Sequence, residues 1–577
     1  MLQKGFKVAI LSLLVIGLCS CGNNGIYCDA CDKTITQTKC TDGSAHTHGK
    51  FIELCVDSVK GVENPGIFEC STCGKYYLDT VSYTDLGLPI VSLNGVLGKV
   101  TKEKKKNIFI KYEGQNQSFS CPAKIKLQGG TSLDYPKKNY NIQFFKDTTY
   151  ESKQKVKLVD AWGKQSKYTL KANWIDYSQM RNVVTAKLYG DIVRSRNIDD
   201  QYSSLFNGGA VDGYPVAVFL DGRFNGLYTL NTAKDEYIFG MKGDETTKEA
   251  VLMGDIYAPS VSLNQEMSGK FDDGWELEYS STEDNPSIGT EWIKESFNAF
   301  IRFLLNSTDE EFKEHIAEYT NVERTIDSML LSWISSAKDN TSKNIIWTTF
   351  DGQHWVPSVY DLDSTWSLVW DGSFGYSPEA WAFYQGNKLW TRVYENYYQD
   401  IVFRYEELRS GPLSLANIDK RFIDFRNSIP THMYEREAKR WPKSPSQDQN
   451  HVSQIVQWAK ESLINFDALF GIDSPDLMPY GINFNLSNGL AVKVYTDEDY
   501  SRKGDLTTKT LSRDKDSGYV SSNEGEVNFE IVVPNKATIN QVVVNGTYGA
   551  LLTHSETGRN NTYRVTKISS NLVININ

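Results

Sequence analysis

The spacing of apolar residues along the middle of the chain changes from the period of a strand to the period of a helix. Strand-like alternation comes first, at residues 123–128, 139–145, 168–172, 215–220 and 226–230. After residue 287 the period is helical, over residues 292–305, 309–319 and 322–336, before a strand pair at 345–350 and 355–359. A strand-rich half followed by a helix-rich half predicts an α+β domain, to which we assign residues 85–475.

One further helix is expected inside the strand-rich half, directly after the strand at 168–172. Asp176 or Ser178 would cap its N-terminus, because short polar side chains accept hydrogen bonds from the first N–H groups of a helix. Val183, Val184 and Leu188 then keep one helical face apolar. This helix would pack against the strands that surround it.

The last part of the chain returns to short strands. A linker around Ser474 and Pro475 ends the helical pattern. Strand-like stretches follow at residues 490–495, 527–533, 539–544, 563–568 and 572–576, with turn residues between them. This spacing predicts an immunoglobulin-like β-sandwich over residues 481–577, which we interpret as a spacer.

The first 20 residues have the pattern of a secretory signal. Lys4 and Lys7 precede an apolar stretch from Val8 to Gly17, and Leu18-Cys19-Ser20-Cys21 resembles a bacterial lipobox. Cys21 would then carry lipid and become the first residue of a membrane-anchored, extracytoplasmic lipoprotein. An ordinary signal peptide with a chance cysteine is the alternative.

Composition excludes some classes of protein. The chain has 577 residues, of which 40% are hydrophobic and 12% aromatic, so it is not largely disordered. The net charge of -11 argues against a nucleic-acid partner, which would need a basic face. After the first 20 residues no apolar run approaches the length of a membrane span.

Six of the nine cysteines lie between residues 28 and 73. Cys28 and Cys31 form one C-x-x-C pair, and Cys70 and Cys73 form a second that resembles a zinc-ribbon knuckle. Two such pairs can complete a tetrahedral zinc site, so we predict a zinc-ribbon-like module within residues 21–80. A site closed by four thiolates has no open position for catalysis, and its role would be structural.

The residues between the two pairs leave alternatives open. Cys40, His46, His48 and Cys55 could bind a second zinc ion, or Cys40 and Cys55 could form a disulfide. All six cysteines could also be paired as disulfides, since thiols are often oxidised outside a membrane.

A group of acidic residues and one amide in the central domain has the spacing of a phosphoryl-transfer site. Asp339 is followed five residues later by Asn344, and Asp361 and Asp363 come after the strand pair. In protein kinases an Asp that accepts the proton of the substrate hydroxyl precedes an Asn and a second Asp that hold magnesium. Carboxylate and amide oxygens suit such a hard cation.

These residues, with several further segments, resemble the spore-coat CotH kinase family, an atypical branch of the protein-kinase fold. The segments that carry the resemblance are Lys126–Ser132 with Pro136–Tyr140, Leu170–Asn182, the hairpin Asp221–Tyr228, and Trp370-Asp371-Gly372. Together they cover roughly residues 88 to 475. The resemblance implies a two-lobed, protein-kinase-like domain.

The same resemblance implies roles for individual residues. Asp339 would be the catalytic Asp, with Asn344 and Asp361 as ligands of magnesium or manganese, and Asp363 as a further ligand or an orienting group. Lys138 would contact the phosphates of ATP, with Lys137 and Lys171 as rivals. The Gly129-Gly130 turn would cover the phosphates with its backbone N–H groups.

One feature departs from the family pattern. Many relatives carry a Glu shortly after the glycine–tyrosine hairpin, where Asn231 and Thr232 stand here, and the nearest acidic residues are Asp235 and Glu236. The residue that would pair with a phosphate-binding lysine, as in ordinary kinases, is therefore missing from its expected position.

The resulting hypothesis is a lipid-anchored extracytoplasmic kinase that transfers the γ-phosphoryl group of ATP to Ser or Thr of a surface protein. The alternative is a catalytically inactive relative that acts in adhesion or scaffolding. A hydrolase finds little support, since neither H-E-x-x-H nor G-x-S-x-G occurs in this region.

Overall fold

The computed structural model describes residues 26–28, 33–35, 40 and 45–472, apart from 97, 197–200, 242, 245, 269–270, 272–273, 379–382 and 448–449. Beyond residue 480 it describes mainly the strands named below. The expected signal of residues 1–20, the lipidation site Cys21 and the predicted ligand Cys31 lie outside the described residues. Among the described residues no helix is long and apolar enough to cross a membrane.

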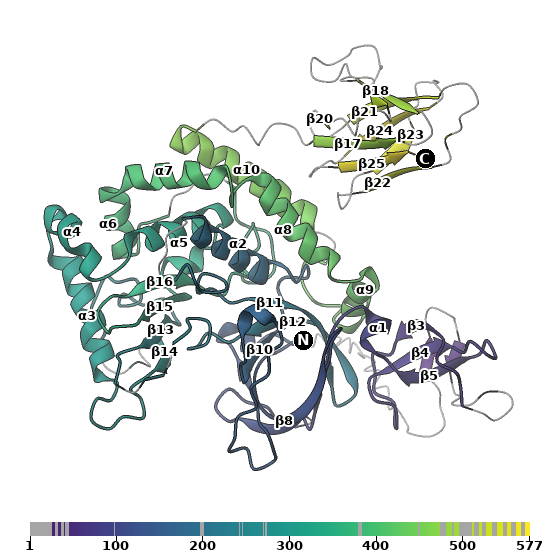
Figure 1. The fold of residues 1–577 in the computed structure, drawn as a ribbon, viewed down its shortest axis with the longest axis horizontal. Coiled ribbons are helices and arrows are strands. Elements are labelled where there is room, and N and C mark those ends of the chain that lie inside the picture. The colour runs from purple at the N-terminus through teal and green to yellow at the C-terminus, as the bar shows by residue number, and fades with distance from the viewer. Residues whose placement is uncertain are drawn as a thin grey trace, which may run out of the picture.

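A small β-module precedes the central domain (Figure 1). Its elements are β1 (Ile26–Cys28), β2 (Lys33–Ile35), β3 (Lys50–Leu54), β4 (Pro65–Glu69), β5 (Tyr76–Thr80) and the short helix α1 (Tyr83–Leu86). β3, β4 and β5 form an antiparallel sheet in that order, and β1 pairs with β2. A capping box of Ser82 and Asp85 begins α1. Whether the module is a zinc ribbon stays a prediction.

A closed seven-stranded barrel follows, in the order β10-β12-β11-β6-β7-β8-β9. Its strands are β6 (Ile90–Asn94), β7 (Lys106–Glu113), β8 (Ser118–Gln128), β9 (Asn139–Phe144), β10 (Lys167–Lys171), β11 (Gly213–Leu220) and β12 (Arg223–Thr232). All neighbours pair antiparallel except β6 and β11, which are parallel. Alternate residues such as Ile110, Ile125 and Val218 fill the interior. The five predicted strands of this half are confirmed, whereas β6 and β7 were not predicted.

The second half of the domain combines a four-stranded sheet with helices (Figure 1). The sheet has the order β14-β13-β15-β16, formed by β13 (Ala250–Gly254), β14 (Trp275–Ser280), β15 (Ile345–Thr349) and β16 (Val356–Val359). The helices are α2 (Arg181–Ser195), α3 (Glu291–Asn306), α4 (Asp309–His315), α5 (Val322–Ser335), α6 (Lys388–Asn396), α7 (Tyr398–Arg409), α8 (Leu415–Asn427), α9 (Thr431–Arg440) and α10 (Val452–Phe470). α5 packs against both α2 and β16 and is buried along almost its whole length. The content is mixed α+β, as predicted.

Short 3-10 turns connect some of these elements, and two of them matter for the site. One is η1 (Thr131–Leu133), directly after β8 and its glycine turn. The other is η4 (Lys338–Thr341), directly after α5. Residues 160–162 and 316–318 form two more 3-10 turns.

The polar residues around Asp176 form a buried hydrogen-bond network at the start of α2. The N-cap residue of α2 is Met180, so neither Asp176 nor Ser178 occupies the predicted cap position. Asp176 acts from further upstream, where its Oδ2 atom accepts hydrogen bonds from the N–H groups of Met180 (3.0 Å) and Arg181 (2.8 Å). Its Oδ1 atom accepts from the buried Arg181 guanidinium at 2.7 Å. The guanidinium also donates to the carbonyl of Thr365, and the side chain of Asn182 accepts from the N–H of Leu362. The segment therefore anchors the loop that carries Asp361 and Asp363.

The C-terminal strands form two sheets. One has the order β20-β17-β25-β22 and the other the order β19-β18-β21-β24-β23. Their bounds are β17 (Gly481–Leu486), β18 (Ala491–Tyr495), β19 (Leu511–Ser512), β20 (Tyr519–Ser521), β21 (Val527–Val532), β22 (Val542–Asn545), β23 (Leu551–His554), β24 (Thr562–Thr566) and β25 (Leu572–Ile576). Phe484 and Phe529 pack edge to face with ring centroids 5.1 Å apart. An immunoglobulin-like topology for these sheets stays a prediction.

Replacing Glu437 by Gln should destabilise the central domain. Lys137 and Glu437 form an ion pair of 2.6 Å between side chains that are 0% and 3% exposed, and it joins the barrel to α9. The variant leaves the Lys137 ammonium buried without its counter-charge, so the free energy of unfolding should fall by about 3–5 kcal/mol. Chemical denaturation measures this loss. Asp160→Asn breaks an exposed pair with Lys157 and should change nothing. Equal stability of Glu437→Gln and the parent would contradict the expected role.

Candidate active site

The acidic residues singled out in the sequence converge on one cavity of about 800 Å³. The barrel contributes Lys171 and the turn from Gly129 to Ser132 to its lining. The other half of the domain contributes Asp339, Asn344, Asp361 and Asp363. The cavity is therefore built from segments that lie far apart in the chain.

Both carboxylate oxygens of Asp339 have partners. The exposed Tyr257 donates its hydroxyl proton to Oδ1, and the ammonium of Lys343 lies 2.7 Å from Oδ2. The 3-10 turn η4 places Asp339 at the end of the buried helix α5, so its backbone position is set by the packing of that helix.

A buried amide links Asp339 to the loop that carries Asp361. Asn340 is 1% exposed; its side-chain nitrogen donates to the carbonyl of Tyr360 (3.1 Å), and its side-chain oxygen accepts from the N–H of Tyr360 (3.2 Å). These two hydrogen bonds join the segment that precedes β15 to the residue that follows β16. Asn344 and Asp361 adopt left-handed backbone conformations, with φ of 67° and 54°. Such strain in non-glycine residues clusters at functional sites.

Lys171 and Asp361 form an ion pair across the cavity. The Lys171 Nζ atom lies 2.7 Å from Asp361 Oδ1, at the end of β10. Burial alone would lower the pKa of Lys171 and raise that of Asp361. The attraction between the two charges outweighs burial, so the pKa of Lys171 is raised and that of Asp361 is lowered. Both groups are held in their charged forms.

Asp363 behaves in the opposite way. Burial, and then the negative charge of Asp361, raise the pKa of Asp363 to about 8. At neutral pH Asp363 therefore holds a proton while Asp361 stays ionised beside Lys171. A cation placed between them would favour the doubly ionised form, because it supplies the positive charge that the proton now provides.

A second lysine of the cavity forms ion pairs with two glutamates that were not predicted from the sequence. Lys234 lies 2.6 Å from Glu278 and 3.0 Å from Glu276, both on β14. Burial lowers the pKa of Lys234, but the charges of these glutamates outweigh it and raise the pKa. The ring of Tyr360 lies near the ammonium groups of both Lys171 and Lys234, which are 5.4 and 5.0 Å from its centroid. Asp235 and Glu236 pair instead with Lys167.

The structure does not bring Lys138, the predicted phosphate ligand, to the cavity. Its ammonium donates to the backbone carbonyls of Leu133 (2.6 Å) and Tyr135, where it stabilises the turn after η1. Lys137 is buried in its pair with Glu437. Of the three lysines considered, Lys171 alone is among the described residues that line the cavity. Lys171 therefore takes the place of Lys138 as the candidate phosphate ligand.

The predicted Gly129-Gly130 turn does line the cavity. Gly129 has φ of +118°, and a Cβ atom there would lie 1.9 Å from the Ser132 hydroxyl oxygen. Any other residue would thus be strained at this φ and would force the Ser132 hydroxyl to move.

Some residues of the cavity were missed by sequence reasoning. They are Tyr257, Lys234, Glu276, Glu278, Lys343 and Tyr360. Only Lys343 had a usable signal, since it stands four residues after Asp339 and can reach back to it. The others reach the cavity through strand pairing and a loop, which no local spacing reports.

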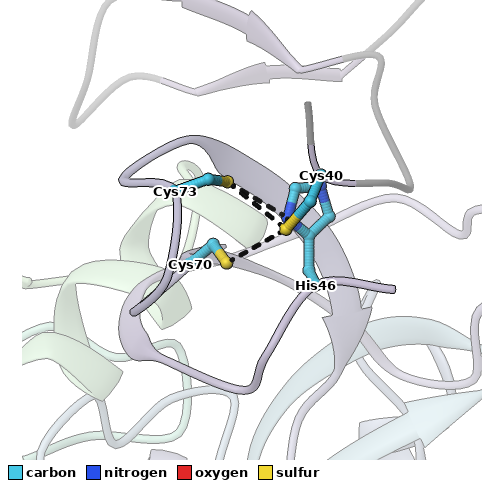
Figure 2. A group of neighbouring side chains, drawn as sticks. All are labelled: Cys40, His46, Cys70 and Cys73. Atoms are coloured by element: carbon cyan, nitrogen blue, oxygen red, sulfur yellow. Dashed lines mark hydrogen bonds between the residues drawn. The ribbon is translucent and has the colours of Figure 1, made fainter. Parts of the chain in front are cut away.

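The cysteine-rich module places its predicted ligands unevenly. Cys70 and Cys73 lie together with Cys40 and His46, as Figure 2 shows. Cys31 and the side chain of Cys28 lie outside what the structure describes. Cys55 forms no disulfide and is buried apart, among Ile35 and Ile67. A Cys40–Cys55 disulfide is therefore not formed.

A family model described as CotH kinase protein matches residues 125–463, which include the glycine turn, Lys171, Asp339, Asn344, Asp361 and Asp363. The cysteine-rich module and the C-terminal sheets lie outside the match. No curated protein matches the chain.

The raised pKa of Asp363 predicts a pH-dependent cost in stability. The carboxyl group of an unfolded Asp has a pKa of about 3.9. Between that pH and about pH 8 the folded protein therefore holds one proton more than the unfolded chain. The contribution of this proton to stability is complete below the lower pKa and is lost progressively until the pH reaches the upper one. Asp363→Asn lacks this titration. In chelator-containing buffer it should therefore exceed the parent in stability by about 4 kcal/mol at about pH 9 and differ from it little at about pH 5.

Thermal unfolding at the two pH values measures this difference. Asp371→Asn is the matched control, because Asp371 is an exposed carboxyl eight residues further along the same region. Its effect should be the same at both pH values. A pH-independent effect of Asp363→Asn would contradict the assignment.

Proposed function

The chain belongs to the CotH kinase protein family, and on that premise we propose that it transfers the γ-phosphoryl group of ATP to Ser or Thr hydroxyls of a surface protein. The observation that carries this proposal is the convergence of Asp339, Asn344, Asp361 and Asp363 on one cavity with Lys171 and a glycine turn. Phosphoryl transfer needs little covalent chemistry from the protein. It needs positioned charges and a group that orients the attacking hydroxyl.

The oxygen donors of the cavity fit magnesium or manganese. Asn344, Asp361 and Asp363 would hold the cation, which would supply positive charge to offset the negative charge of the phosphates. The observation that supports this fit is the donor set, because one amide and two carboxyl side chains line the same cavity. The donors are all oxygens, as a hard cation prefers.

The remaining residues have roles that follow from their placement. Asp339 would accept a hydrogen bond from the acceptor hydroxyl and then its proton. Lys171 would bind phosphate oxygens from the barrel side, and Asp361 keeps its ammonium charged and directed into the cavity. The turn at Gly129 and Gly130 would bring backbone N–H groups close to the phosphates. Asn340 and Arg181 are positioning residues that act through the backbone of neighbouring loops.

The place of action is a further part of the proposal. The charged start, apolar stretch and Cys21 of the sequence support secretion and a lipid anchor on the outer side of a bacterial membrane. The acceptor would then be an extracytoplasmic protein. The negative net charge supports a protein acceptor rather than a nucleic acid.

One observation favours the alternative, a catalytically inactive protein that acts in adhesion or scaffolding. Asp339 is held by Tyr257 and Lys343, and Lys171 is held by Asp361, so these charges already have partners within the chain. In that case the cavity serves the stability of the domain. Nucleotide binding separates the two functions.

Magnesium-ATP should raise the thermal unfolding midpoint of the full chain, and Asp361→Ala should remove this rise. A ligand that binds only the folded state adds about 2.7 kcal/mol at a concentration of roughly 100 times its dissociation constant. Each variant is compared with its own midpoint without ATP, since loss of Asp361 also leaves Lys171 unpaired. Asp371→Ala, an exposed carboxyl nearby, should keep the rise. No rise in the parent at millimolar ATP would refute the kinase and favour the scaffold.

Tyr257→Phe should increase phosphoryl transfer to a serine-containing model peptide. The Tyr257 hydroxyl donates to Asp339, which is the contact that an acceptor hydroxyl has to make. Tyr257 is 60% exposed, so displacing its bond costs about 1 kcal/mol, and kcat/KM for the peptide should rise about fivefold. Tyr150→Phe, remote from the cavity, should leave the rate unchanged. A lower rate in Tyr257→Phe would show instead that Tyr257 assists the reaction.

A further inference from the structure

The cysteine-rich module brings four metal-binding side chains to one point, outside the region that matches the family. Cys40, His46, Cys70 and Cys73 each direct one ligand atom toward the others, and these four atoms all lie within 4.8 Å of one another (Figure 2). We propose that they bind a single zinc ion in a tetrahedral, structural site. The site is independent of the proposed transfer reaction.

The distances between the ligand atoms agree with the edges of a zinc tetrahedron. The Cys40 sulfur lies 3.6 Å from the Cys70 sulfur and 3.5 Å from the Cys73 sulfur. The His46 Nδ1 atom lies 3.2 Å from the Cys40 sulfur and 3.6 Å from the Cys73 sulfur. Zinc bonds of about 2.3 Å to sulfur and about 2.0 Å to nitrogen predict edges of about 3.8 Å and about 3.6 Å. The side chains are thus spaced as ligands around a common centre.

The chain supports this geometry locally. The N–H of Gly74 donates to the carbonyl of Cys70 and the N–H of Cys70 to the carbonyl of Lys75, both at 2.9 Å, which closes the turn that presents Cys70 and Cys73. Gly74 has φ of +65°, which favours glycine at this position. The turn thereby places two sulfurs on the same side, as a metal knuckle requires.

His46 is held in the orientation that the site needs. Its ring stacks on the buried Tyr77 with centroids 4.4 Å apart. Nδ1 faces the sulfurs, while Nε2 is buried and has no hydrogen-bond partner among the described residues. The orientation of the ring thus makes Nδ1 the nitrogen that a metal ion held by the sulfurs would meet.

The neighbouring residues that could have served as ligands are directed elsewhere. His48, two residues after His46, is half exposed and lies near Asp79 and Asp85. Cys55 is buried among apolar residues of the module. The set of three sulfurs and one imidazole differs from the predicted set, in which Cys28 and Cys31 completed the site of Cys70 and Cys73. Four protein ligands leave no open position, so the role is structural.

Metal analysis of the purified full-length mature chain tests the site. Protein prepared under reducing conditions with zinc, and then dialysed to remove free metal, should contain a tightly bound zinc ion that involves His46 and Cys73. His46→Ala and Cys73→Ser should each lose about one zinc equivalent relative to the parent. The matched controls His48→Ala and Cys55→Ala should retain it. His46→Cys should also retain it, because a fourth thiolate completes the same tetrahedron.

A second measurement covers variants that fold poorly. Cobalt in place of zinc in the parent should give the intense visible bands of a tetrahedral thiolate site, and His46→Cys should shift them. A parent without tightly bound metal would overturn the proposal. So would zinc that persists in Cys40→Ser and His46→Ala but disappears in Cys28→Ser and Cys31→Ser, which would restore the ligand set predicted from the sequence.

Discussion

The cavity depends on the ion pair between Lys171 and Asp361. It joins the last residue of barrel strand β10 to the loop after β16, and so holds the two halves of the domain together at the cavity. Its electrostatic effect is as important as its position. Asp339, Asp361 and Asp363 would repel one another in a shared cavity, and the ammonium groups of Lys171 and Lys343 offset that repulsion. Protonation of Asp363 neutralises the negative charge that these lysines do not balance.

Much of the sequence pattern around the cavity serves to place this pair. Asp176 accepts from the N–H of Arg181 at the start of α2 and pairs with its guanidinium, and Arg181 in turn donates to the carbonyl of Thr365, two residues after Asp363. These residues are buried and do not line the cavity among the residues that the structure describes. The motif that contains them is thus a scaffold for the acidic loop. This explains why residues of a charged, polar character are packed in the interior of a large domain.

The sequence allowed the acidic part of the site to be predicted better than its basic part. Asp339, Asn344 and Asp361 could be placed together because a helix end and a hairpin fix their separation along the chain. The lysine could not be chosen in the same way. Lys138 precedes β9 and bends back onto its own turn, whereas Lys171 ends β10 and extends into the cavity. Which lysine of a strand-rich region faces a cavity depends on the barrel closure, and no local pattern of residues reports that closure.

Some helices and the grouping of the cysteines also could not be predicted, because they depend on contacts between distant parts of the chain. α3, α4 and α5 were predicted from their period, but α6 to α9 were not, and α9 carries Glu437, a buried charge that compensates Lys137. Cys70 and Cys73 were recognised from their spacing. Their association with Cys40 and His46 depends on the pairing of β3 with β4 and of β4 with β5, which brings residues 30 positions apart into contact.

Contacts through α9 connect the module to the barrel. Glu53 of β3 pairs with Arg436, and the rings of Phe51 and His432 lie 6.0 Å apart. One residue after Arg436, Glu437 accepts from the N–H of Leu227 at 2.7 Å and pairs with Lys137, which closely follows the turn at Gly129. A module held rigid by metal would therefore fix one face of α9, and α9 fixes the barrel beside the cavity. On this argument the module belongs to the framework of the site and is more than a spacer that precedes the central domain.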